Sequence, residues 1–193
     1  MGTATKTDRR ILKTKAAINK AFLELFSEKE FDRITINDIS ERADVNRGTV
    51  YLHYTDKYDL LNKCIKDHLD KMILSCTFTK FMQKKGNQVE AIEAMKSLFI
   101  YFEENFLFFS SMLSNPKTST FRECMLKIIT TTIQEKLDMQ GINQGMDNEL
   151  ITQYTASAFV GTVEWWILNH MPRSPQFMAE HTWKLFERNN ICS

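Results

Sequence analysis

Apolar residues along most of this chain recur every three or four positions, which is the spacing of amphipathic helices. Strand-like alternation is hard to find, and only 6 Gly and 3 Pro interrupt the 193 residues. The pattern predicts an all-α protein. Its long helices are expected at residues 9–27, 56–80, 88–109, 121–139, 147–171 and 175–189.

Residues 35–57 follow a different pattern, that of two short helices joined by a tight turn. Thr35 and Asp38 have the spacing of a capping box at the start of the first short helix. The turn is predicted at residues 44–46, because Asp tolerates the left-handed conformation and Asn46 is a strong N-cap. The second short helix is expected from Arg47 to about His53.

The second short helix is polar on one side, while Val50 and Tyr54 can face inward. A helix-turn-helix presents the N-terminal residues of its second helix to the major groove of DNA. Asp56 is placed to cap the next helix, and Lys57 in its first turn can bind phosphate. Two short helices are more often plain core packing, but this combination of features favours DNA binding. The predicted DNA contacts are Thr35, Arg47, Gly48, Thr49, Tyr51, His53, Tyr54 and Lys57.

On these residues, positions 9–62 resemble the DNA-binding domain of the TetR family of bacterial transcriptional regulators. Asp44 and Glu30 stand where Gly is common in the family, and Tyr54 stands where Phe is common; each is physically tolerable. The matching residues are Phe26, Phe31, Thr35, Ile36, Ile39, Ala43, Val45, Gly48, Thr49, Tyr51, Tyr54, Lys57, Leu60 and Leu61.

The resemblance implies an N-terminal three-helix helix-turn-helix DNA-binding domain, residues 1–56. It also implies a C-terminal helical ligand-binding and dimerisation domain, residues 57–193. The segment WWILNHMPRSP, residues 165–175, is similar to a C-terminal subtype that includes regulators of dihydroxyacetone kinase operons. The helix predicted from Lys57 to Lys80 would link the two domains mechanically.

Phe and Met residues recur every three or four positions along the helix predicted at residues 88–109. They therefore form a stripe on one side of that helix, and the last residue of the stripe is Phe109. Most such stripes are ordinary core, but Phe and Met also make adaptable pocket linings. We expect an apolar or aromatic effector near Met95, Phe99, Phe102, Phe106, Met125 and Trp166.

The last two predicted helices carry small residues around positions 156–162, which would let another helix approach closely. In the family that the chain resembles, two C-terminal helices pair with their copies in a four-helix dimer interface. Trp165, Trp166 and Trp183 are expected at such a surface or in its core. The interface residues implied here are Tyr154, Ala158, Gly161, Trp165, Phe177, His181 and Leu185.

The charge and composition of the chain are consistent with a DNA-binding regulator and add little to that interpretation. The net charge is +1, but residues 1–20 hold six basic residues against one Asp, which suits phosphate attraction or a solvated tail. No apolar run approaches the roughly 20 residues that span a bilayer, and no signal core begins the chain. The four cysteines are scattered, as expected of reduced thiols in the cytoplasm.

Catalytic and metal-binding patterns are missing from the sequence. Cys64 and His68 could share a helix face, but a zinc site needs about four ligands and the sequence nearby supplies no others. No phosphate-cradling Gly loop, nucleophile elbow or catalytic carboxylate pair occurs. We therefore expect no enzyme, no metal and no cofactor.

These patterns and the family resemblance together predict a cytoplasmic, homodimeric, ligand-responsive repressor that binds a palindromic double-stranded DNA operator. One alternative is a transcriptional activator switched by a partner protein. A second is a helical carrier or enzyme in which the helix-turn-helix is vestigial.

Overall fold

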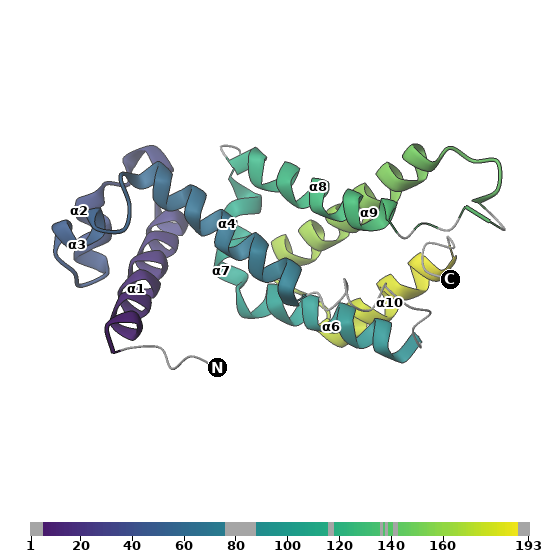
Figure 1. Cartoon of the computed structure of the whole chain (residues 1–193), viewed down its shortest axis with the longest axis horizontal. Coiled ribbons are helices and arrows are strands. Elements are labelled where there is room, and N and C mark those ends of the chain that lie inside the picture. The colour runs from purple at the N-terminus through teal and green to yellow at the C-terminus, as the bar shows by residue number, and fades with distance from the viewer. Residues whose placement is uncertain are drawn as a thin grey trace. The chain divides into compact units, whose positions relative to one another are not determined.

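The structure is a computed structural model that describes residues 6–75, 88–115, 118–135, 137, 139–140 and 143–188. Every regular element in these ranges is helical, which confirms the all-α class (Figure 1). The elements are α1 (Lys6–Glu28), the 3-10 helix η1 (Phe31–Arg33), α2 (Ile36–Arg42), α3 (Arg47–Tyr51), α4 (Lys57–Ser75), α6 (Gln88–Glu104), α7 (Phe106–Ser114), α8 (Ser119–Gln134), α9 (Asn148–Leu168) and α10 (Pro175–Arg188). Among the described helices, none has both the length and the apolar character that crossing a bilayer requires.

The chain divides into two compact units, residues 1–68 and 69–193. The division falls inside α4, whereas the family resemblance placed the domain boundary after residue 56. The first part of α4 belongs to the N-terminal unit, where its side chains Leu60 and Cys64 are buried.

The core of the N-terminal unit is a small aromatic cluster supplied mainly by α1. The rings of Phe22 and Phe26 lie 5.7 Å apart, and both contact Phe31 of η1. Ile39 of α2 and Val50 of α3 are fully buried. These side chains hold both short helices in place, and the inward orientation predicted for Val50 is confirmed.

Ion pairs on the surface fix α2 to α1. Arg42 binds Glu28 through two hydrogen bonds of 2.8 Å, which raise the pKa of Arg42 and lower that of Glu28. Lys29 lies 2.9 Å from Asp38, which also forms the predicted capping box with Thr35. The Lys29 hydrogen bond, together with the Thr35 amide and hydroxyl, lowers the pKa of Asp38 to about 2.

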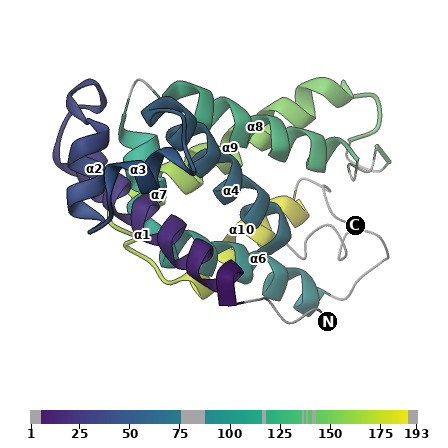
Figure 2. The same cartoon turned by 60° about the vertical axis from the view of Figure 1, so that its left-hand side comes forward.

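In the C-terminal unit, α8 packs along α9 and α10 packs along α6, and both pairs can be followed in Figures 1 and 2. Edge-to-face aromatic contacts fill the space among α6, α7, α8 and α9. Phe99 meets Trp166 at 5.3 Å between ring centroids, and Phe102 meets Phe109 at 4.8 Å. The buried ring of Phe121 joins this cluster, so the unit has a dense aromatic core.

The predicted single helix at residues 88–109 is wrong, because the chain breaks at Asn105 into α6 and α7. The backbone of Asn105 leaves helical geometry, with φ −113° and ψ 30°, and its side-chain amide donates to the Tyr101 carbonyl at 2.8 Å. The helix expected at 121–139 instead spans Ser119–Gln134. The part of the predicted helix 56–80 that follows residue 75 lies outside the described residues.

Replacing Asp38 by Asn should make stability less dependent on pH between about 4 and 2. The folded-state pKa of Asp38 lies below the ordinary value near 3.9, so its ionised carboxylate stabilises the fold above about pH 4. This contribution is lost as the pH falls through the folded-state pKa. Circular dichroism melts across the range should show a shallower loss of Tm for Asp38→Asn than for the wild type.

The matched control is Asp44→Asn. Asp44 has a positive φ of 51°, which Asn tolerates, and its carboxylate forms no hydrogen bond or ion pair with another described residue. Asp44→Asn should follow the wild-type pH dependence. Parallel curves for the wild type and Asp38→Asn would contradict a stabilising role for the Asp38 carboxylate.

Candidate functional site

The second short helix, α3, is held by contacts at both of its ends. Asn46 caps it by accepting a 2.8 Å hydrogen bond from the Gly48 amide, and Asp44 takes the left-handed conformation predicted for the turn. At the other end Tyr54 is buried, and its hydroxyl donates to the Asn19 side chain at 3.0 Å. Burial raises the pKa of Tyr54 to about 12, so the phenol stays protonated.

The outer side of α3 carries a preformed polar pair. Arg47 donates to the Tyr51 hydroxyl at 3.1 Å, and its guanidinium lies 5.4 Å from the centre of that ring. Both side chains are exposed, and Leu52 beside them is 80% exposed. A Cβ on Gly48 would lie 3.2 Å from the capping oxygen of Asn46, so Gly at this position preserves the N-cap.

The other residues predicted to contact DNA differ in how exposed they are. Thr49 and His53 are half-buried next to the exposed pair. Thr35 lies on the surface, but its hydroxyl belongs to the capping box. Tyr54 belongs to the core and presents no group outward. Leu52 was not predicted as a contact, although an apolar residue on the side of the helix opposite to Val50 is a recognisable signal.

Lys57 lies at the start of α4, and its ammonium group is engaged within the protein. It donates hydrogen bonds of 3.0, 2.9 and 3.0 Å to the carbonyl oxygens of Phe31, Asp32 and Ile34. An ammonium group has three donors, so none remains for a phosphate in this conformation. Asp56 caps α4 as predicted, accepting from the amides of residues 58 and 59. The contact of Lys57 with phosphate stays a prediction.

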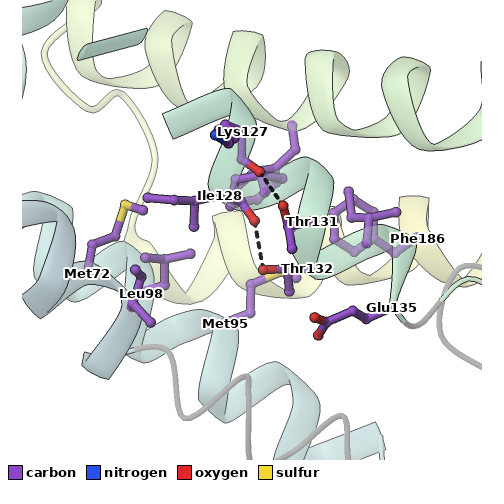
Figure 3. A pocket seen from close by; sticks show the side chains of 13 residues that line it. Met72, Met95, Leu98, Lys127, Ile128, Thr131, Thr132, Glu135 and Phe186 are labelled. Atoms are coloured by element: carbon purple, nitrogen blue, oxygen red, sulfur yellow. Dashed lines mark hydrogen bonds between the residues drawn. The ribbon is translucent and has the colours of Figure 1, made fainter. Parts of the chain in front are cut away.

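The C-terminal unit contains a cavity of about 380 Å³ (Figure 3). Apolar side chains from α4, α6, α8, α9 and α10 make up most of its wall, and polar side chains of α8 complete it. The lining residues are Met72, Ile73, Met95, Leu98, Lys127, Ile128, Ile129, Thr131, Thr132, Ile133, Glu135, Phe159 and Phe186.

Of the six residues predicted to line a pocket, only Met95 reaches this cavity. Phe99, Phe102, Met125 and Trp166 are almost fully buried in the packed core instead. Phe106 starts α7 beyond the break at residue 105, and its ring lies 6.1 Å from that of His170. The predicted stripe mixed two helices, because the spacing of its aromatic residues continues unchanged across the break.

The prediction took one residue of α8, Met125, for the pocket and did not include the α8 residues that line the cavity. Ile128, Thr131, Thr132 and Glu135 recur at spacings of three and four, so they share one helix face. A helix face on which polar residues alternate with Ile could have been predicted to line a cavity. No group of three or more metal-binding side chains occurs among the described residues.

The outer faces of α9 and α10 carry the residues predicted for a dimer interface. Tyr154, Trp165, Phe177 and Leu185 are between 40 and 69% exposed. Ala158 and His181 are exposed and Gly161 is half-buried. Trp166 and Trp183, in contrast, are buried within the unit. Leu150, which is also exposed and extends this face along α9, was not predicted.

The fold and the exposed α3 surface define a DNA-binding helix-turn-helix regulator. Residues 18–64 match the family model described as bacterial regulatory proteins, tetR family. Residues 90–188, about half of the chain, match the model described as transcriptional regulator C-terminal region. The chain belongs to the TetR family of transcriptional regulators.

Two curated relatives carry regulator names. The probable acrEF/envCD operon repressor of Escherichia coli K12 is 25% identical over 86% of this chain and 81% of its own length. The uncharacterized HTH-type regulator YxbF of Bacillus subtilis is 33% identical over 44% of this chain. The match covers only 24% of YxbF.

Solved structures share the fold. The dihydroxyacetone kinase operon activator DhaS aligns over 92% of this chain and 96% of its own, with a TM-score of 0.64 and 18% identity. The regulator FadR of Bacillus subtilis, solved with stearoyl-CoA, aligns over 90 and 98% with a TM-score of 0.66 and 17% identity. At these identities the likeness is one of fold.

Replacing Lys57 by Met should lower the free energy of unfolding by about 2 kcal/mol, because three carbonyl oxygens lose a charged donor. Urea unfolding followed by circular dichroism measures this loss. Lys66→Met is the matched control, since Lys66 is exposed on the same helix. Unchanged stability, with a salt dependence of DNA binding reduced by about one unit, would instead assign Lys57 to a phosphate.

Proposed function

We propose that this chain is a ligand-responsive repressor that acts in the cytoplasm and binds a palindromic operator as a homodimer. The observation that carries the proposal is the exposed Arg47–Tyr51 pair on α3, a helix seated by its N-cap and by buried Val50. Such a helix enters the major groove, where Arg47 can reach base edges or phosphates and Tyr51 can reach phosphates. Exposed Leu52 beside them is positioned for apolar contact with a thymine methyl group.

Repression, as opposed to activation, is supported by the Escherichia coli relative, whose name describes an operon repressor. The fold likeness to the activator DhaS, at 18% identity, does not favour activation. A cavity of about 380 Å³ favours a small molecule over a partner protein as the effector. FadR, which shares the fold, was solved with stearoyl-CoA, an example of a ligand with a long apolar part.

Dimerisation is supported by the composition of α9, which is apolar on nearly all sides. A helix of this kind must bury more than one face. Phe159, Val163 and Trp166 bury one face inside the unit, while Tyr154 and Trp165 leave the other exposed. A second copy of the same face is a suitable partner, because a two-fold dimer uses a self-complementary surface.

The switch that we propose couples the cavity to α3 through α4. Met72 of α4 lines the cavity, while Asp56 caps the start of the same helix. An effector that prefers one orientation of α4 would change the spacing of two recognition helices in a dimer. The two helices must meet half-sites about 34 Å apart, so a mismatch weakens operator binding. The usual coupling free energy is about 1–3 kcal/mol, and it acts equally in both directions.

Replacing Arg47 by Ala should weaken binding to the selected palindromic duplex by about tenfold to a hundredfold, because a base-contacting Arg contributes roughly 1–3 kcal/mol. The operator is first selected from a pool of random duplexes, and affinity is then measured by fluorescence anisotropy at several salt concentrations. Lys66→Ala removes one exposed positive charge from α4 and should leave the affinity nearly unchanged. Equal affinities for wild type and Arg47→Ala would contradict the placement of α3 in the groove.

Replacing Gly161 by Leu should convert the dimer to a monomer without unfolding the protomer. A Cβ at this position meets no atom within 4 Å, so the protomer has room for it, whereas a closely packed second copy does not. Sedimentation velocity measures the oligomeric state, and thermal melting checks the fold. Glu103→Leu adds the same side chain to an exposed position on α6 and should remain dimeric. A dimeric Gly161→Leu protein would place the interface elsewhere.

A further inference from the structure

The polar wall of the cavity accepts hydrogen bonds more readily than it donates them. The hydroxyl of Thr131 donates to the Lys127 carbonyl at 3.0 Å, and that of Thr132 donates to the Ile128 carbonyl at 2.9 Å (Figure 3). A hydroxyl has one hydrogen, so each Thr has only lone pairs left for a ligand. Both side chains therefore face the cavity as acceptors.

Glu135 adds a negative charge to this wall. Its carboxylate is exposed, and in Figure 3 it lies below Thr132 on the side toward Met95. No hydrogen bond or ion pair to it is found among the described residues. Glu135 is also the C-cap of α8, where the carbonyl ends of a helix carry partial negative charge. Both features favour a cation at this end of the cavity.

Lys127 is the one basic side chain among the lining residues, and it lies toward the opposite end of the lining stretch of α8. It precedes Glu135 by eight residues, which corresponds to about 12 Å along a helix. A ligand of moderate length therefore meets one charge or the other. The polar part of the wall thus has three acceptor groups (Thr131, Thr132 and Glu135) and one donor group (Lys127). The remaining wall consists of Met, Ile, Leu and Phe side chains.

We propose that the cavity binds an organic cation with an apolar body and a protonated amine, the amine lying against Glu135 and the two Thr hydroxyl oxygens. This inference rests on the proposed function, of which it specifies the effector. An apolar body fills the space among Met95, Leu98 and Phe159, and the N–H groups of the amine supply the donors that the wall lacks. A carboxylate at the Glu135 end of the cavity would face acceptors and a negative charge.

The test compares three ligands that share one alkyl chain: decylammonium, decanol and decanoate. Isothermal titration calorimetry with the full chain should show that decylammonium binds about fivefold to tenfold more tightly than decanol. A ratio of this size is expected because a partly exposed charge pair contributes a binding free energy on that scale. Decanoate should bind more weakly than decanol. Glu135→Gln should remove the preference for the amine and leave the affinity for decanol unchanged. Lys127→Met, on the same helix, should retain the preference.

Three outcomes would overturn the proposal. Tightest binding by decanoate, lost in Lys127→Met, would assign the cavity to anions. Equal affinities for the three ligands would mean that the wall recognises only apolar area. No binding by any of them would remove the cavity as the effector site.

Duplex binding by the same preparations separates this inference from the proposed function. If the operator binds and none of the three ligands does, only the cavity inference fails. If decylammonium binds as expected and no duplex does, the proposed regulator function fails while the ligand class stands. When both bind, operator should weaken decylammonium binding by the same factor that decylammonium weakens operator binding.

Discussion

A helix of five residues cannot hold its own shape in water, since isolated helices shorter than about 12–15 residues are marginal. The proposed recognition helix α3 has five residues, so its direction is set by its surroundings. Asn46 fixes its first turn, and buried Val50 and Tyr54 fix its inner side. The surface that we propose for DNA binding is therefore only as well ordered as the aromatic core of α1 and the ion pairs that hold α2 on it.

The structure of the C-terminal unit depends on a different requirement: a long apolar helix must be buried on more than one side. Helix α9 packs along α8 inside the unit and leaves a second apolar face outside. The cavity lies between α8 and the other helices of the unit, so one helix wall separates it from the exposed face. The proposed ligand site and the proposed dimer face thus share the same structural elements, which is a suitable arrangement for coupling them.

Local features of the fold could be predicted from the sequence, and features that depend on distant packing could not. The Thr35–Asp38 box, the turn at Asp44 and the Asn46 cap are decided within three or four residues. The break at Asn105 was missed because the aromatic spacing runs through it without change. Lys57 reaches carbonyl groups 23–26 residues earlier in the chain, a contact that no local pattern reveals. The cavity wall on α8 likewise depends on which helices pack around it.

Trp165 and Trp166 are neighbours in the chain but lie in opposite environments. Trp165 is half exposed on the outer face of α9, whereas the Trp166 indole is buried and donates to the Arg173 carbonyl at 2.8 Å. The two indoles therefore differ in emission wavelength and in access to collisional quenchers such as iodide. Covering the outer face changes the signal of Trp165, while rearrangement near Phe99 changes that of Trp166. The unmodified chain thus carries two adjacent optical reporters, one of its surface and one of its core.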